Sequence, residues 1–169
     1  MRPGLPPAGG EGEVTVLGVN CSTDCAYLAV DDDGRLRGDV VELVPAPALG
    51  ESSDQLLAVL AELERVLAEV AADKVVLLKP ESGRLTKRTH SEHVPRIALE
   101  TLVRLAAAET GRSIELLARP TLRSRLELPS EGKLVEHVGS RIPEKIGSNW
   151  SEERQLAALA ALAGEAAGS

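Results

Sequence analysis

Charged residues able to bind an anion follow the most apolar short run of the chain. The apolar run Val75 to Leu78 leads through Lys79-Pro80 to Glu81. The segment that follows carries five cationic or imidazole side chains, namely Arg84, Lys87, Arg88, His90 and His93. A short apolar run closed by proline is typical of a strand buried on both faces of a parallel sheet, and ligands of such sheets bind beyond the carboxyl ends of the strands. We therefore predict an anion-binding site around Glu81.

A second basic set follows the last strand that the sequence predicts. It consists of Arg119, Arg123 and Arg125. Two basic segments at the same edge of a sheet would suit contacts with phosphates, and we expect Arg84, Lys87, Arg88, Arg119 and Arg123 to make them. Charged segments of this kind are also commonly no more than solvated, and that alternative stays open.

The cysteines, histidines and aspartates suggest two metal sites, both of which have simpler explanations. Cys21 and Cys25, with His90 and His93, would make a Cys2His2 zinc site if the two pairs met. The cysteine spacing is a loose match to a zinc knuckle, so two reduced cysteines and two exposed histidines are the preferred interpretation. Asp31 to Asp33, before Gly34, favour a solvated hairpin turn over a metal site.

Composition limits the classes of function. The net charge of −7 argues against a protein that coats nucleic acid through bulk electrostatics. Aromatic residues make up 1% of the 169 residues, so only Tyr27 and Trp150 are available to stack on bases. No secretory signal or membrane-spanning run is apparent, and a cytoplasmic protein without membrane attachment is expected. Residues 1–12 are predicted to be a disordered tail, and residues 13–165 a single domain.

Strand and helix signals alternate along this domain. Three antiparallel strands come first, at Val14–Val19, Cys25–Val30 and Arg35–Val44. A helix capped by Ser52 then leads to the strand Val75–Leu78, and a second helix, with Pro95 in its first turn, ends near Gly111. A strand at Ile114–Ala118, a short helix capped by Ser130 and a last helix capped by Ser151 complete the order. This order predicts an α/β fold with a five-stranded mixed sheet flanked by helices.

The order of elements is similar to the ribonuclease H-like fold, and its details resemble the RuvC-type Holliday-junction resolvases. Gly18-Val19-Asn20 matches the family's Gly-hydrophobic-Asp pattern at the end of the first strand. Glu81 matches a Glu at the end of the fourth strand. Glu152 to Leu159 matches the start of the last helix, where the family carries one or two further Asp residues.

The resemblance implies a two-metal phosphodiesterase site in which several residues are altered. Mg²⁺ or Mn²⁺ ions about 4 Å apart would be held by carboxylates, with Glu81 and Glu152 as the predicted metal ligands. Here Asn20 replaces the bridging Asp, and Gln155 is placed at the second late Asp position. The expected catalytic set is Glu81, Glu152, Glu153 and the weak ligand Asn20.

Three functions follow from this resemblance. The first choice is a domain that has a degraded metal site and binds nucleic acid or a partner associated with nucleic acid. The alternatives are a Mg²⁺- or Mn²⁺-dependent nuclease and a non-catalytic protein-interaction subunit. A partner protein and a homodimer are both left open.

Overall fold

A mixed six-stranded sheet forms the centre of the molecule. The computed structural model describes residues 14–47, 49, 52–80, 90–142 and 149–166. The strands are β1 (Thr15–Cys21), β2 (Cys25–Asp32), β3 (Arg35–Arg37), β4 (Leu43–Pro45), β5 (Lys74–Leu78) and β6 (Ser113–Leu117). Their order is β3-β2-β1-β5-β6, and β4 also pairs with β2. β1, β5 and β6 are parallel, whereas β2 runs antiparallel to β1, β3 and β4. The predicted α/β class and mixed sheet are confirmed.

The third predicted strand is divided in two, which is why the sheet has six strands instead of five. β3 pairs with one half of β2 and β4 with the other half. The residues between them include Gly38 and Asp39, which are poor strand formers. The predicted continuous strand Arg35–Val44 is therefore wrong, although both pieces lie beside β2 as expected.

The acidic hairpin is a turn, but it is only partly solvated. Asp33 and Gly34 have φ values of 51° and 84°, the left-handed conformations that a tight hairpin requires. Asp31, in contrast, is completely buried, and its Oδ2 accepts a hydrogen bond from the Gly34 N–H at 3.1 Å. The expectation of a fully solvated tip is wrong for Asp31. This residue is still part of β2, and its side chain faces the helices that cover the sheet.

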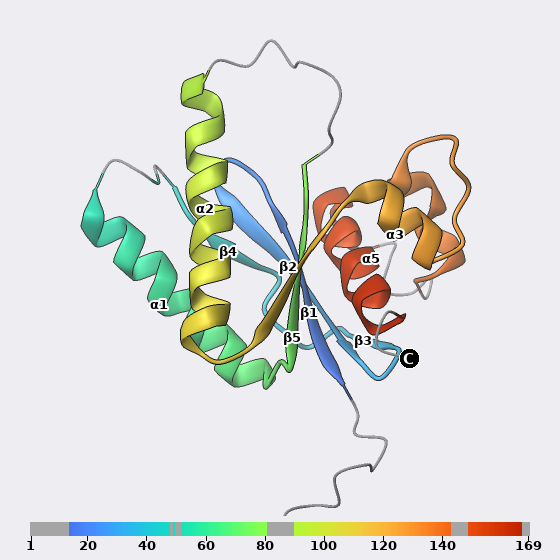
Figure 1. Cartoon of the computed structure of the whole chain (residues 1–169), viewed down its shortest axis with the longest axis horizontal. Helices are drawn as coiled ribbons and strands as arrows, with labels where there is room; N and C mark the ends of the chain where they lie inside the picture. Colours follow the sequence, from blue (N-terminus) through green and yellow to red (C-terminus); the bar gives the residue numbers. More distant parts are fainter. Residues whose placement is uncertain (1–13, 48, 50–51, 81–89, 143–148, 167–169) are drawn as a thin grey trace, which may run out of the picture.

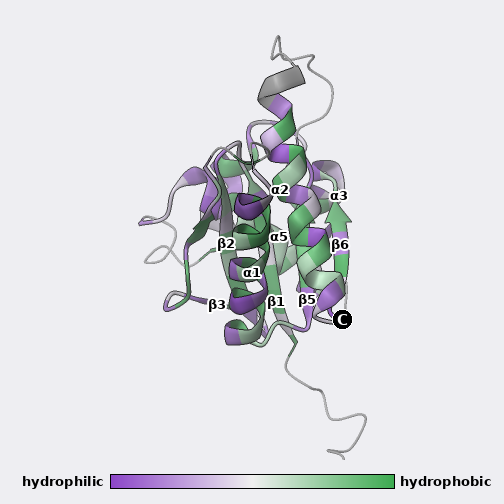
Figure 2. Cartoon of the chain, turned by 90° about the vertical axis from the view of Figure 1, so that its left-hand side faces the viewer, coloured by the Kyte–Doolittle hydropathy of each residue, from purple (hydrophilic) through white to green (hydrophobic). Residues whose placement is uncertain are grey.

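Helices cover both faces of the sheet (Figure 1). They are α1 (Ser53–Val70), α2 (His90–Glu109), α3 (Arg119–Arg125), the 3₁₀ helix η1 (Leu134–Ser140) and α5 (Glu152–Ala166). α1 and α2 pack on one face over Leu17, Val19 and Leu28, and α3, η1 and α5 pack on the other over Val16 and Val76. Hydrophobic residues gather along the strands and on the inner sides of the helices (Figure 2).

Two helix starts follow the predicted caps, and two do not. Ser52 Oγ accepts from the Gln55 N–H at 3.3 Å, and Ser151 Oγ accepts from the Arg154 N–H at 3.3 Å. α2 instead begins at His90, which places Pro95 inside it. A proline this close to an amino-terminal end removes a single backbone hydrogen bond, so the preceding turn still forms. Ser130 does not cap the short helix, because η1 begins at Leu134 with Lys133 as its cap.

The short helix α3 was not predicted. It starts at Arg119, directly after β6, with Pro120 in its first turn, a position that suits proline. Its seven residues contain Leu122 as their single buried side chain. A helix this short has too few turns to show an apolar periodicity.

α5 approaches β1 closely enough to require small residues. A Cβ on Gly18 would lie 2.0 Å from the Ala157 carbonyl oxygen. A Cβ on Gly164 would lie 2.3 Å from Val76 Cγ2. This contact places the amino-terminal turn of α5 over the carboxyl end of β1, where the candidate site lies.

Candidate functional site

Asn20 links the end of β1 to the first turn of α5. Its side chain is 5% exposed, and Nδ2 donates to the Glu153 carbonyl oxygen at 3.2 Å. A carboxylate at this position would set an anionic oxygen against that carbonyl. The amide is therefore the side chain that fits the observed contact, because it supplies a donor.

The first turn of α5 presents a cation to the sheet. Glu152 and Glu153 are exposed, whereas Arg154 is 3% exposed. Arg154 Nε donates to the Leu28 carbonyl oxygen at 3.1 Å, and Nη1 lies 3.4 Å from a Glu42 carboxylate oxygen. Burial lowers the pKa of the Arg154 guanidinium, the nearby Glu42 charge opposes that effect, and the group stays protonated at neutral pH because its starting value is so high.

Arg154 is the site residue that the sequence interpretation missed. Gln155 aligns with the second Asp that the family carries at the start of its last helix. Its Nε2 donates to the Trp150 carbonyl oxygen at 2.7 Å. The inward-facing side chain is Arg154, which precedes the buried residues Ala157 and Ala158 by three and four positions. That helical spacing was readable in the sequence and puts position 154 on the buried face.

The end of β5 lies at the same edge as Asn20. Val19 pairs with Leu77 in the parallel register, so β1 and β5 end side by side. The Lys79 N–H donates to the Leu117 carbonyl oxygen at 2.9 Å, which keeps β6 alongside. The predicted site residues that follow Pro80 lie outside the described residues, namely Glu81, Arg84, Lys87 and Arg88.

The described residues do not form a two-metal donor set. Within the described ranges, no group of three or more His, Cys, Asp or Glu side chains is arranged to hold an ion. At the expected centre, the Asn20 amide donates to the Glu153 carbonyl oxygen and offers no anionic oxygen. This contact disfavours a pair of divalent cations, which need shared anionic ligands. The predicted metal ligands Glu81 and Glu152 remain a prediction, since Glu81 is not described.

The two cysteines lie on opposite faces of the sheet. Cys21 is 3% exposed in the core beneath α1 and α2, and burial is the main reason that the pKa of its thiol is raised. Cys25 alternates with Ala26, a residue of that same core, and therefore faces the α5 side. Both thiols are free. A zinc site that needs both cysteines would have to cross the sheet, so the preferred interpretation of two reduced cysteines fits the fold.

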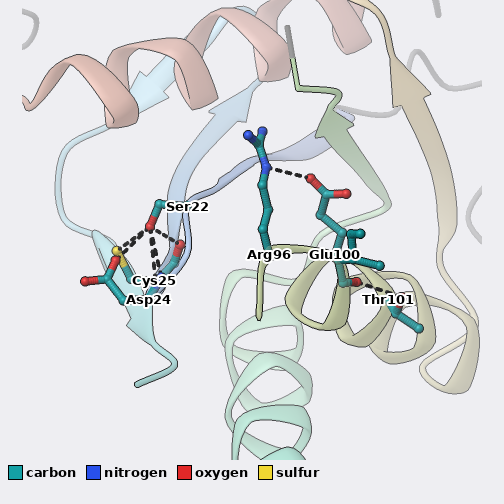
Figure 3. A network of polar contacts seen from close by, with 7 residues as sticks. Ser22, Asp24, Cys25, Arg96, Glu100 and Thr101 are labelled. Carbon is teal, nitrogen blue, oxygen red and sulfur yellow. Dashed lines mark hydrogen bonds and ion pairs between the residues drawn. The ribbon is translucent and has the colours of Figure 1, made fainter. Parts of the chain in front are cut away.

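Polar contacts fix the turn after β1 (Figure 3). Ser22 Oγ lies 2.9 Å from Asp24 Oδ1 and 3.4 Å from Cys25 Sγ. On α2, Arg96 Nε lies 3.0 Å from Glu100 Oε1, and both side chains are close enough to Cys21 to affect its pKa. The expectation of two exposed loop histidines is wrong for His93, which lies partly buried on α2 because that helix begins at His90. The His90 side chain lies outside the described residues.

The second basic set has structural partners. Arg123 donates to the Gly132 carbonyl oxygen at 2.6 Å and also to that of Pro129. Arg125 pairs with Glu115, and its hydrogen bond lowers the pKa of that carboxyl group. Arg119 is partly buried at the start of α3. Contact of Arg119 and Arg123 with nucleic acid stays a prediction.

Two grooves lie near this edge of the sheet. One of about 280 Å³ is lined by the ends of β5 and β6 and by α2, including Lys79, Thr101 and Arg104. The other, of about 290 Å³, is lined by Tyr27, Trp150 and Arg154. Tyr27 pairs with Asn20 across β1 and β2, so the second groove adjoins the position expected for chemistry.

Solved structures with the same arrangement identify the fold. Thermus thermophilus RuvC in complex with a Holliday junction substrate superposes with a TM-score of 0.68 at 15% identity, over 89% of this chain and 91% of that one. A second T. thermophilus RuvC structure gives a TM-score of 0.66 at 16% identity, over 89% of this chain and 92% of that one. The protein has the RuvC-type ribonuclease H-like fold.

A third solved structure has this RuvC-type fold as well. The yeast mitochondrial Holliday junction resolvase Ydc2 gives a TM-score of 0.59 at 11% identity, over 94% of this chain and 80% of that one. No protein-family model and no curated protein matches the sequence. The predicted resemblance is confirmed at the level of fold. Sequence identities this low establish a shared fold and nothing about activity.

Hydrophobicity gives no sign of a membrane span in the RuvC-like domain. Among the described residues, each helix is too short or too polar to cross a bilayer. The cytoplasmic location stays a prediction.

Proposed function

We propose that this RuvC-like domain binds nucleic acid and does not cleave it by a two-metal mechanism. The observation that carries the proposal is the Asn20 amide, which is buried at the end of β1 and bound to the Glu153 carbonyl oxygen. A two-metal nuclease needs shared anionic oxygen ligands at this position. Position 20 offers a neutral hydrogen-bond donor in their place.

The likeness to nucleic-acid enzymes supports binding as the retained activity. One of the two T. thermophilus RuvC structures was obtained with a Holliday junction substrate. In this chain, the basic residues predicted for phosphate contact follow Pro80, where β5 ends beside β1. Loss of the bridging carboxylate removes hydrolysis without removing these cations. Binding should therefore persist and should weaken as salt rises.

Binding and cleavage are tested together with four-way junction, duplex and single-stranded DNA. Fluorescence anisotropy at several salt concentrations measures binding, and gel assays with Mg²⁺ or Mn²⁺ measure cleavage. We expect salt-sensitive binding without metal-dependent cleavage. The Lys87→Glu/Arg88→Glu variant should weaken binding about tenfold or more, because each phosphate contact adds to the salt-dependent affinity.

Two outcomes would replace the proposal. Cleavage that requires a divalent ion and disappears in Glu81→Gln would establish the nuclease alternative. Absence of both cleavage and binding would leave the protein-interaction subunit as the function to test. Arg35→Glu/Arg37→Glu, on β3 at the far edge of the sheet, is the matched control and should bind like the unaltered protein.

A further inference from the structure

The chain's only tyrosine and only tryptophan meet in one groove. Tyr27 comes from β2, and Trp150 precedes α5 by two positions. The groove has a volume of about 290 Å³ and is also lined by Arg154, Ser151 and Glu42. Both rings are partly exposed, although large aromatic side chains usually fill cores. Their position indicates a surface for a planar ligand.

The Trp150 ring is held in place from within the protein. The Arg154 guanidinium lies 3.6 Å from the ring centroid, a stacking contact that such groups favour. Gln155 also fixes the Trp150 backbone through its hydrogen bond to the carbonyl oxygen. A ring that is already ordered loses little entropy when a ligand stacks on it.

Tyr27 is likewise held as a neutral ring. A hydrogen bond with Cys25 is the main cause that raises the pKa of Tyr27 to about 12, and burial and nearby acidic groups add to it. The phenol therefore stays protonated across the physiological range. It offers a flat surface that carries no charge.

Arg154 has hydrogen-bonding capacity beyond its observed contacts. Nε donates to Leu28, Nη1 lies beside Glu42, and Nη2 is buried without a hydrogen-bond partner among the described residues, so an acceptor reaches it only when Glu42 is displaced. The Glu42 side chain is 72% exposed, so it screens the buried charge weakly and can move aside. A charged guanidinium with an unpaired N–H group favours carbonyl or phosphate oxygens as additional acceptors.

We propose that this groove holds a single unpaired nucleobase, stacked on Trp150 and Tyr27, with an oxygen acceptor of the nucleotide directed to Arg154. The proposal rests on the proposed nucleic-acid binding and names the feature that the domain would select. The volume lies at the lower end of the range for ligand pockets and suits one ring system. Bases inside a duplex are stacked on their neighbours and cannot enter, whereas unpaired bases stack readily on aromatic side chains.

Trp150 reports directly on the groove, because it is the only tryptophan of the chain. Its intrinsic fluorescence would be measured with a paired duplex, the same duplex with one unpaired base, and a single strand. A free nucleoside monophosphate provides a separate arm that tests the base without the strand. We expect quenching by the unpaired base, the single strand and the mononucleotide, and little change with the paired duplex.

Tyr27→Leu tests the stacking without removing the fluorophore. It should weaken binding of the duplex with an unpaired base by about tenfold, the scale expected for loss of one stacking partner, and leave paired-duplex binding unchanged. Leu57→Ala, a change at an exposed residue of α1, is the matched control and should alter neither. Arg154→Lys retains the charge but loses the planar stack, so it should weaken binding of the unpaired base while circular dichroism verifies that it folds.

The outcomes separate this inference from the proposed function. Duplex binding with no Trp150 quenching by any ligand would overturn the base site and leave nucleic-acid binding intact. Quenching by the mononucleotide with no binding of any strand would support the base site and overturn the proposed function. Equal loss of paired and unpaired binding in Tyr27→Leu would also overturn the base site.

Discussion

Single side chains decide what the carboxyl edge of this sheet can do. Asn20 has the position of a metal-bridging carboxylate in the family pattern, yet its observed contact needs a donor. The amide at position 20 therefore makes the site less suited to divalent cations, since it gives them no anionic oxygen to share. Arg154, in the same turn of α5, directs its buried charge to the Leu28 carbonyl oxygen and to Glu42.

The Asn20→Asp variant tests this contact. We expect it to lower the free energy of unfolding by about 1–3 kcal/mol without added metal, because a carboxylate oxygen would then face the Glu153 carbonyl. Urea unfolding measures the change, and Asn20→Ala, which removes the donor without adding charge, should be less destabilising. If Mg²⁺ raises the free energy of unfolding of Asn20→Asp but not that of the unaltered protein, position 20 is the metal-ligand position that the family pattern predicts. Equal stability of Asp and Asn at this position would contradict the hydrogen-bond argument.

Asp31 should make stability depend on pH. Burial is the main cause that raises its pKa from 3.8 to about 6 in the folded protein, and the Gly34 N–H opposes this. Because the folded pKa is the higher one, the protonated form stabilises the fold fully below about pH 4, and this contribution disappears as the pH rises through about 6. The lost stability amounts to about 3 kcal/mol at 1.36 kcal/mol per pKa unit.

Asp31→Asn should remove this pH dependence. The amide oxygen can still accept the Gly34 N–H, so we expect a higher free energy of unfolding at pH 8 and little change at pH 4. Thermal unfolding across this range measures the difference. Asp33→Asn, at the exposed tip of the same turn, is the control and should keep the slope of the unaltered protein. An unchanged slope in Asp31→Asn would assign the pH dependence to other groups.

At the scale of elements, the contact between α5 and β1 carries the site. Gly18 allows the Ala157 backbone to approach, and this approach sets Asn20 against the first turn of α5. The site therefore depends on helix packing several residues away. A change in that packing should affect binding as well as stability.

Gly18→Ala is expected to destabilise the fold by about 3 kcal/mol or more. Its Cβ would lie 2.0 Å from the Ala157 carbonyl oxygen and 2.7 Å from the Ala161 nitrogen, so α5 must shift. Urea unfolding gives the free energy. Gly38→Ala, where an added Cβ meets nothing within 4 Å, should change it by less than about 0.5 kcal/mol. A mild effect at Gly18 would show that α5 repacks easily.

For the whole molecule, the outer face of α2 is a surface where a second copy could pack. Val94, Ile97 and Leu105 are exposed along this helix, and Leu116 is exposed on the neighbouring edge strand β6. Exposed apolar residues that gather on one surface commonly mark an interface. The homodimer considered from the sequence remains a prediction, and this is the surface we assign to it.

Light scattering after size-exclusion chromatography tests the homodimer. We expect twice the monomer mass for the unaltered protein and the monomer mass for Ile97→Glu, because a charge would be buried at the interface. Leu57→Glu, on the exposed side of α1, is the control and should retain the mass of the unaltered protein. A monomer at all concentrations would remove this interface.

Much of the architecture could be read from the sequence because it depends on local patterns. The β-branched and apolar run before Asn20, the Asp-Gly turn and the Ser52 and Ser151 caps each depend on a few neighbouring residues. The apolar spacing in α1 and the Ala/Leu-rich run of α5 then indicate which faces are covered. These signals sufficed for the order of elements and hence for the RuvC-type fold, whereas α3 was too short to show one.

Only the tertiary structure decided which side chains share the site. Arg154 follows two exposed glutamates in the sequence, and its burial depends on β2 and Trp150, which pack against it. The meeting of Tyr27 with Trp150 joins residues more than a hundred positions apart, through the sheet register and the close approach of α5. Asn20 acquires its role from a carbonyl on that same helix. Local patterns place each residue on its element, but contacts between distant elements determine its partners.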